Sequence, residues 1–536
     1  MKKIKYLSIA MLMLTCISTS FKSLSKSKAS VENAMKKRVN HDGINNKITI
    51  SGRFLGSNVP NEVSMILWNH IISGDKRMFT SKRKFSAPVK NGRFELFADR
   101  IDGISYASFG WGSSSQDGEI YEYLKTYLTT AGDQIHIDIS EYKPKVPLFD
   151  GIGSSSCLNC KTFSFSGSGA LKYQCRYEMD MIKENSRIEC EKILSEIKYS
   201  SNMSVSDRLN QRKQGVNCYK IPQVICLENY KGKFPQEIYD LLKIDMLSGA
   251  AFELSWAAKV RLLGLDAVNE TQKIKDKSTL ISYTKEIGQW AEGIDTNLLT
   301  QSAWYSKFLL VNLYIESELS NGKPILQIIT NRFTGELRER LIAADLLDNS
   351  WTWDSKQFDQ NSKAAEALIK NPAYKNAIDS ILHTTSKGSN VYNFTLLDSS
   401  GKNVRLQDFL GKVVFMDFWF VGCGGCANYY QQTVSKTEEL FKHNPNVVFL
   451  TMSIDRDRDK WMKGVNSGEY TSKSVVNLYS KDGSSDPIVK KFNVLSYPHP
   501  LLIDANGKLF SNSNKELRDN GVTGLVEMIN SALATK

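Results

Sequence analysis

Two cysteines three positions apart, Cys423 and Cys426, have the residue type and spacing best suited to chemistry in this chain. They flank two glycines and follow an apolar segment, residues 413–419 (VVFMDFW), whose β-branched and aromatic residues predict a buried strand. The residues after the pair, to about 443, have a helical pattern. Because free backbone N–H groups and the helix dipole favour an anion at a helix start, we expect Cys423 to be a nucleophilic thiolate.

The spacing of the pair predicts a second role. Side chains three positions apart at a helix start lie on the same side and can form a disulfide with little backbone movement. After Cys423 attacks a substrate disulfide, Cys426 can therefore resolve the mixed disulfide. The same spacing also occurs in zinc sites and structural disulfides, but no second pair of metal ligands lies nearby in the sequence, and we expect no bound metal.

Two segments resemble a known family. Residues 411–426 (GKVVFMDFWFVGCGGC) and 496–509 (SYPHPLLIDANGKL) resemble the TlpA/ResA-like thiol-disulfide oxidoreductases of the thioredoxin superfamily. The resemblance implies an α/β thioredoxin fold for residues 388–536 and an activity that needs no cofactor.

The resemblance also implies roles for single residues. Pro498 occupies the position of the family's cis-proline, which faces the cysteine pair, and Asp417 that of a buried carboxylate that takes the proton of Cys426. We expect Pro498, Tyr497 and Trp419 to contact the substrate. The chain departs from the family pattern at Gly422, where a tryptophan is usual, and at the two glycines between the cysteines.

The first residues indicate export. Residues 1–22 combine a basic start with an apolar run and small residues, as a secretory signal peptide does, so we expect a location in the periplasm or cell envelope. Cys16 is an alternative lipid-attachment site, although the preceding residues fit that motif poorly, and a membrane tether is expected only if Cys16 is lipidated. No later run reaches the ~20 apolar residues of a membrane helix.

Length and charge limit the remaining possibilities. A chain of 536 residues is long enough for about three domains, and its net charge of +12 is not concentrated in a basic tract, which argues against nucleic-acid binding. Alternating strand patterns predict an antiparallel β-sandwich at 45–145, which resembles an N-terminal β domain of Bacteroidetes-type secreted proteins. Helical patterns dominate 146–385.

The middle region holds six of the nine cysteines and predicts structural disulfides. If Cys175 and Cys190 share one continuous helix, they should not pair with each other, because fifteen residues of helix span about 22 Å. If Cys157 and Cys160 pair with each other, Cys175 and Cys190 must each bond one of Cys218 and Cys226. The candidates are Cys157, Cys160, Cys175, Cys190, Cys218 and Cys226.

These observations predict a thiol-disulfide oxidoreductase, more as a reductase than as an oxidant, whose partners are client proteins with disulfides and an unidentified thiol electron donor. A thiol peroxidase is a weaker alternative, because the proline and threonine of the peroxidase motif are missing before Cys423. A third alternative is a binding or assembly protein in which the thioredoxin-like domain serves only as a scaffold.

Overall fold

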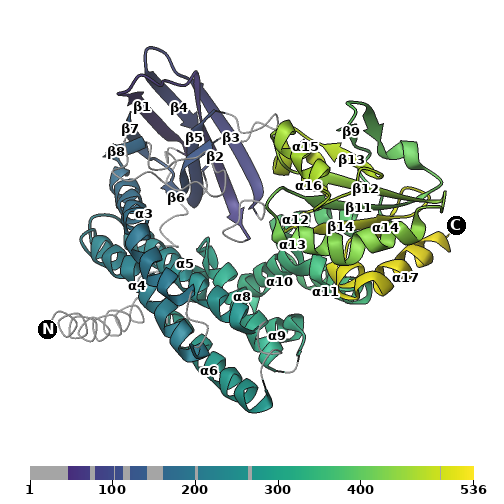
Figure 1. Cartoon of the computed structure of the whole chain (residues 1–536). Coiled ribbons are helices and arrows are strands. Elements are labelled where there is room, and N and C mark those ends of the chain that lie inside the picture. Colours follow the sequence, from purple (N-terminus) through teal and green to yellow (C-terminus); the bar gives the residue numbers. More distant parts are fainter. Residues whose placement is uncertain are drawn as a thin grey trace. The chain divides into compact units, whose positions relative to one another are not determined.

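The structure is a computed structural model, and it describes residues 46–72, 79–101, 103–112, 121–141, 161–198, 203–262, 269–320, 322–494 and 496–535. Figure 1 shows the helices and strands in sequence colours. The predicted signal peptide, Cys16, Cys157 and Cys160 lie outside the described residues. Contacts divide the chain into two compact units, of which the second consists mainly of Ile342–Lys536.

The first unit begins with two four-stranded sheets that share one hydrophobic core. Alternating burial along the strands, such as exposed-buried repeats in β4, sends every second side chain into this core. The first sheet has the order β4-β1-β7-β8 and the second the order β3-β2-β5-β6. Their bounds are Ile48–Phe54 (β1), Glu62–Ile71 (β2), Phe79–Pro88 (β3), Arg93–Ala98 (β4), Ile104–Trp111 (β5), Tyr121–Thr130 (β6), Gln134–Glu141 (β7) and Lys161–Ser168 (β8).

Two features of these sheets correct the sequence prediction. β1 and β7 pair in parallel, with Ile50 opposite Ile135, so the domain is not purely antiparallel. β8 pairs with β7 from beyond residue 145, so the β region extends past the expected boundary to Ser168. The sequence could not predict either feature. The alternation of apolar and polar residues along a strand indicates which face is buried, but not which strand pairs with it or in which direction.

Helices form the rest of the first unit, as the sequence predicted. Side chains of Ser204 and Asn269 accept backbone N–H bonds at the starts of α4 and α6, which ends the preceding loops. The helices are Ala170–Lys198 (α3), Val205–Glu228 (α4), Gln236–Leu262 (α5), Glu270–Gly288 (α6), Thr296–Gln301 (α7), Tyr305–Leu319 (α8), Ile325–Arg332 (α9) and Gly335–Asn349 (α10), which crosses into the second unit.

A disulfide joins α3 and α4, which pack against each other in this unit. Cys190 on α3 bonds Cys218 on α4, with Cα atoms 5.8 Å apart. Cys175 lies on the same helix as Cys190, so the expectation that these two do not pair is confirmed. Cys175 and Cys226 are buried free thiols rather than disulfide partners, which corrects their candidacy. Burial raises the pKa of the Cys175 thiol to about 12, and an inert packing role follows.

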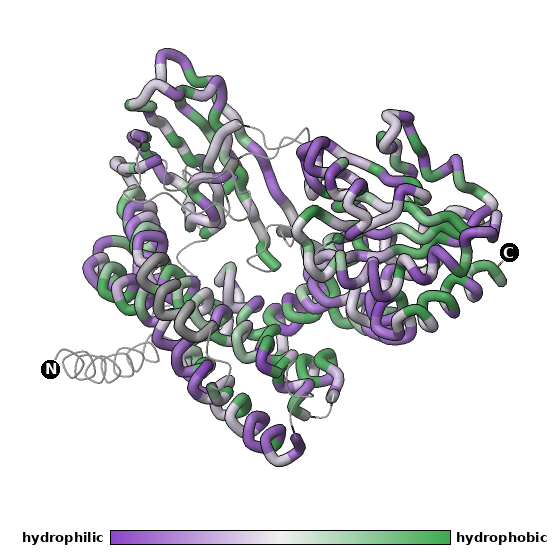
Figure 2. The backbone as a smooth tube through the Cα atoms, in the orientation of Figure 1, coloured by the Kyte–Doolittle hydropathy of each residue, from purple (hydrophilic) through white to green (hydrophobic). Residues whose placement is uncertain are grey.

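The second unit is an α/β domain around one mixed sheet of order β10-β9-β13-β12-β11-β14-β15. β11, β12 and β13 run parallel, and β14 is antiparallel to β11. Figure 2 shows the hydrophobic centre of this sheet. The strands are Thr395–Asp398 (β9), Asn403–Arg405 (β10), Val413–Trp419 (β11), Val447–Ser453 (β12), Val476–Tyr479 (β13), His499–Ile503 (β14) and Leu509–Ser511 (β15).

Helices complete this unit, and two of them were expected elsewhere. α11 (Ser355–Leu368) and α12 (Pro372–Thr385) belong to the second unit, whereas the sequence placed the division at residues 385–388. The lysine Nζ of Lys515 and the backbone N–H of Ser355 tie α11 to the segment after β15. The other helices are Gly424–Tyr429 (α13), Ser435–Phe441 (α14), Arg458–Ser467 (α15), Pro487–Lys491 (α16) and Gly521–Leu533 (α17).

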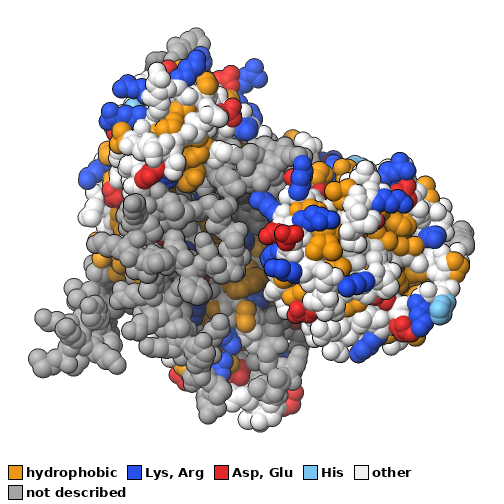
Figure 3. Space-filling model, turned by 45° about the horizontal axis from the view of Figure 1, so that its top comes forward, with side chains coloured by type: hydrophobic (Ala, Val, Ile, Leu, Met, Phe, Trp, Pro, Cys, Tyr) orange, Lys and Arg blue, Asp and Glu red, His pale blue; other side chains and the backbone are white. Residues whose placement is uncertain are grey.

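Figure 3 presents one face of the molecule, on which charged and hydrophobic side chains of the described residues are intermixed. Lys and Arg side chains of the second unit lie among acidic and hydrophobic ones there. Among the helices of the described part of the chain, none combines the length and the apolar character needed to cross a membrane.

Candidate functional site

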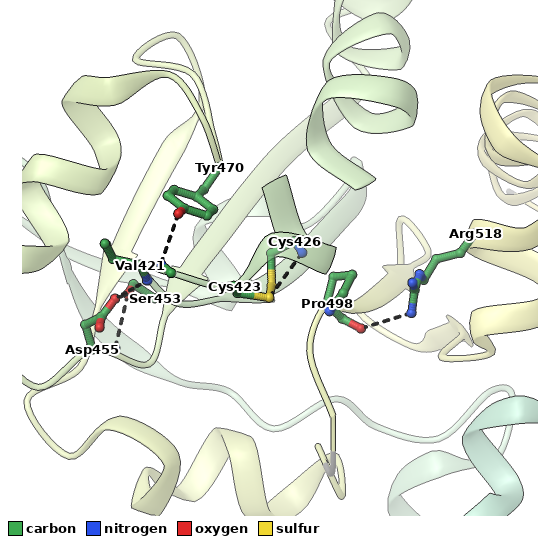
Figure 4. Close-up of a disulfide and its surroundings, with 9 residues drawn as sticks. Val421, Cys423, Cys426, Ser453, Asp455, Tyr470, Pro498 and Arg518 are labelled. Atoms are coloured by element: carbon green, nitrogen blue, oxygen red, sulfur yellow. Dashed lines mark hydrogen bonds between the residues drawn. A yellow bond between two sulfur atoms is a disulfide. The ribbon is translucent and has the colours of Figure 1, made fainter. Parts of the chain in front are cut away.

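The cysteine pair lies where the buried central strand of the second unit ends. All seven residues of β11 are buried, and after four intervening residues α13 begins at Gly424 with Cys423 as its N-cap. Cys423 and Cys426 form a disulfide with Cα atoms 5.2 Å apart, and the Cys423 sulfur accepts the Cys426 backbone N–H at 3.1 Å (Figure 4). The predicted strand, cysteine pair and helix are therefore present in that order.

Exposure distinguishes the two sulfur-bearing residues. Cys423 is 7% exposed and Cys426 only 1% exposed, while the neighbouring Gly422, Gly424 and Gly425 are exposed. Both residues are buried, and Cys423 is the more exposed of the two, as expected for the sulfur that meets a partner first. No cluster of three or more potential metal ligands occurs among the described residues.

The loop before β14 places Pro498 against the cysteine pair. The Tyr497–Pro498 peptide bond is cis, as the resemblance implied. A Cβ atom at Gly425 would lie 3.6 Å from Pro498 Cδ, so the proline ring faces the segment between the cysteines (Figure 4). Tyr497 is half-buried, and its ring packs edge-on against Phe420 at 5.6 Å. Tyr497 and Phe420 both pack against the hydrophobic cluster that contains Cys423.

Trp419 does not belong to this surface, which corrects its expected role in substrate binding. Its side chain is fully buried, its indole N–H donates to Thr451 Oγ1 at 2.6 Å, and its ring stacks on Tyr470. Since β11 is covered on both faces, the tryptophan at its end packs inward and cannot contact a substrate.

Asp417 lies in the same strand, and burial raises the pKa of its carboxyl to about 7. The positive charge of Arg518 and backbone N–H groups of Phe418 and His499 oppose this shift without cancelling it. One carboxyl oxygen, Oδ1, has no hydrogen-bond partner within the described structure. A buried carboxyl of this kind can take up and release a proton near neutral pH.

Three further side chains surround Asp417. The Arg518 guanidinium lies over the Tyr429 ring at 5.4 Å, and its Nη1 lies 3.5 Å from the Pro498 carbonyl oxygen. His499 is fully buried, both of its ring nitrogens lack partners in the described residues, and burial lowers its pKa to about 3. No sequence pattern pointed to Arg518, which lies about a hundred positions after Asp417 in the chain.

Comparisons with known proteins agree with this geometry. A family model described as thioredoxin-like matches residues 411–509, which include the cysteine pair and Pro498. The C-terminal domain is thioredoxin-like. This domain is similar to the thiol-disulfide oxidoreductase ResA of Bacillus thuringiensis subsp. konkukian, with 29% identity over 122 residues, 23% of this chain and 66% of that protein. It is likewise similar to ResA of Bacillus subtilis, with 29% identity over 143 residues, 25% of this chain and 70% of that protein.

Solved structures also resemble the thioredoxin-like domain. The thioredoxin domain of a thiol-disulfide oxidoreductase from Bacteroides vulgatus is 25% identical, with coverage of 27% of this chain and 96% of that chain and a TM-score of 0.24. A thiol:disulfide interchange protein from Bacteroides sp. is 29% identical, with coverage of 28% and 91% and a TM-score of 0.24. The chain spans about two thirds of the length of the curated relatives that it matches. The residues matched by the family model all lie in the second unit.

Proposed function

We propose that the protein is a thiol-disulfide oxidoreductase of the periplasm or cell envelope that reduces disulfides of client proteins through Cys423 and Cys426. The main support is a disulfide-bonded pair at a helix start in which Cys423 is the N-cap and the more exposed residue, as expected for the sulfur that a partner meets first. The similarity to ResA proteins, which are named thiol-disulfide oxidoreductases, and the signal-like residues 1–22 are consistent with this proposal.

The reaction starts from the reduced pair. The Cys423 thiolate attacks one sulfur of a client disulfide, a Cys423–client bond forms, and the client's other sulfur leaves as a thiolate that takes a proton. Cys426 then loses its proton and attacks the Cys423 sulfur, which releases the second client thiolate. Two electrons have moved to the client, and the Cys423–Cys426 disulfide remains. A dithiol donor must reduce it before the next cycle.

Asp417 serves the second step of this cycle. The thiol of Cys426 is shielded from solvent, and we assign the uptake of its proton to the buried carboxyl of Asp417. A carboxylate with a pKa near 7 is partly ionised at neutral pH and is basic enough to assist. When the donor reduces the disulfide, Cys426 leaves as a thiolate and takes the proton back from Asp417.

A trapping experiment tests the proposal. Cys426→Ala removes the resolving sulfur, so the exported variant should accumulate mixed disulfides between Cys423 and client proteins. The matched control, Cys423→Ala with Cys426→Ala, should trap none. Absence of trapped clients, together with a wild-type chain that fails to reduce insulin, would instead favour a binding or assembly role for the domain.

A further inference from the structure

The backbone immediately before Cys423 has an unusual conformation. Gly422 has φ +97°, a region that residues with a side chain rarely adopt, so the tryptophan usual at this position would be strained here. Glycine tolerates this conformation but also has the widest conformational freedom. Without a restraint, the chain that leads to the nucleophile would sample other conformations.

Two side chains from outside the cysteine motif supply that restraint. The Gly422 backbone N–H donates to the Tyr470 hydroxyl oxygen at 2.9 Å, and the Val421 N–H donates to Asp455 Oδ2 at 2.8 Å. Figure 4 shows both bonds beside the disulfide. The Cys423 N–H is also paired, with the Phe420 carbonyl oxygen at 3.1 Å. Three consecutive N–H groups therefore have fixed partners.

Tyr470 is itself held firmly. It is 6% exposed, and its ring stacks on Trp419 with centroids 5.1 Å apart and an interplanar angle of 5°. α15 closes the arrangement, because a Cβ atom at Gly464 would lie 2.7 Å from Val421 Cγ2 and 2.8 Å from the Trp419 ring. The phenol therefore has little freedom to leave Gly422.

Asp455 is fixed in the same way. Its Oδ2 also accepts the Ser453 hydroxyl at 3.0 Å, and its Oδ1 pairs with Lys460 Nζ at 2.6 Å. The Asp455 side chain is 5% exposed, so its carboxyl group is largely shielded from water. A buried carboxylate with three partners is a stable acceptor for a backbone N–H.

We propose that Tyr470 and Asp455 are positioning residues, which hold the backbone before Cys423 so that its sulfur is presented for attack. The inference rests on the proposed function and adds residues that the cysteine motif does not contain. In the reduced protein the disulfide no longer fixes the pair, so these hydrogen bonds become the main restraint on the approach to Cys423. Orientation of a reacting group contributes strongly to rate.

The chain offers a matched control for Tyr470. Tyr479 stacks on the buried Trp461 at 4.9 Å, and its hydroxyl donates to the Arg456 carbonyl oxygen at 2.5 Å. Tyr470→Phe and Tyr479→Phe therefore each remove one hydroxyl from a stacked ring in the same unit. Only the first removes a bond to the loop before Cys423.

The test uses the reduced full-length chain and compares these two variants. Tyr470→Phe should lower the single-turnover rate of attack on insulin disulfides about tenfold, equivalent to about 1.4 kcal/mol, and should speed hydrogen exchange of the Gly422 amide. Tyr479→Phe should change both less than about twofold. Equal attack rates for the two variants would overturn the inference.

A second variant pair guards against misfolding of the first. Asp455→Asn weakens the acceptor for Val421 and should slow attack, whereas Asp486→Asn alters a comparably buried carboxylate that caps α16 by accepting the Ile488 N–H at 2.9 Å. Equal attack rates for this pair would also count against the inference. A wild-type chain that reduces no disulfide would overturn the proposed function, and the inference with it, whereas equal variants of an active wild type overturn the inference alone.

Discussion

Replacement of Asp417 by Asn in the oxidised chain should make the thioredoxin-like domain more stable at alkaline pH. Burial raises the pKa of this carboxyl from 3.8 to about 7, so the folded domain binds the proton more tightly than the unfolded chain does. The stability that protonation provides is full below pH 3.8 and is lost as pH rises through 7. Asparagine cannot ionise, and the variant avoids that loss.

The size of the effect follows from the shift. About three pH units correspond to about 4 kcal/mol once the carboxyl is fully ionised. Between pH 5 and pH 8 the wild type should lose about 2.5 kcal/mol of this amount, because part of the loss has already occurred at pH 5. The stability difference between Asp417→Asn and the wild type should grow by that much over the same range.

Hydrogen exchange can measure this difference within the full chain. Amides of β11 and β14 report the opening of the domain, and comparison of the variants at each pH cancels the intrinsic pH dependence of exchange. The same comparison cancels the contribution of His499. Asp519→Asn, which replaces an exposed carboxylate, is the control. Its stability should differ from that of the wild type by close to zero at both pH 5 and pH 8.

Kinetics provides the second half of the test. Asp417→Asn should slow resolution of the mixed disulfide by about a hundredfold, the lower range for loss of a general base, while the first attack by Cys423 stays unchanged. The reasoning would be refuted by a stability difference that is the same at pH 5 and pH 8. Unchanged resolution would remove Asp417 from the mechanism.

Three further predictions concern other parts of the chain. His499→Met should match the wild type at pH 7.5 and lose less stability on acidification to pH 5 in hydrogen exchange, because the lowered pKa of the histidine makes the folded domain resist protonation below 6.5; an equal loss would contradict this. Arg518→Gln should raise, by up to about one pH unit, the pH at which resolution is half-maximal, since the guanidinium lowers the pKa of Asp417; an unshifted rate profile would argue against that electrostatic role. Joint replacement of Cys190 and Cys218 by Ala should destabilise α3 and α4 by about 3 kcal/mol, from the loss of a cross-link over 28 residues, and unchanged exchange in those helices would exclude a stabilising disulfide.

Local pattern was enough to predict the redox motif. The apolar run 413–419, the cysteine spacing and the helical pattern that follows are all short-range features, and each reappears in the structure. The same reasoning placed Cys175 and Cys190 on one helix and so excluded a bond between them. Such features follow from sequence because backbone geometry repeats over a few residues.

Long-range packing determined the rest. Trp419 was expected to contact the substrate, but cover on both faces of β11 buries its side chain. Tyr470 and Asp455 bond the loop before Cys423 from positions more than thirty residues away. Long-range packing also determines that β1 pairs in parallel with β7 and that residues 342–385 belong to the second unit. A sequence pattern shows which side of an element is apolar, but the partner that covers that side is selected only when distant segments pack together.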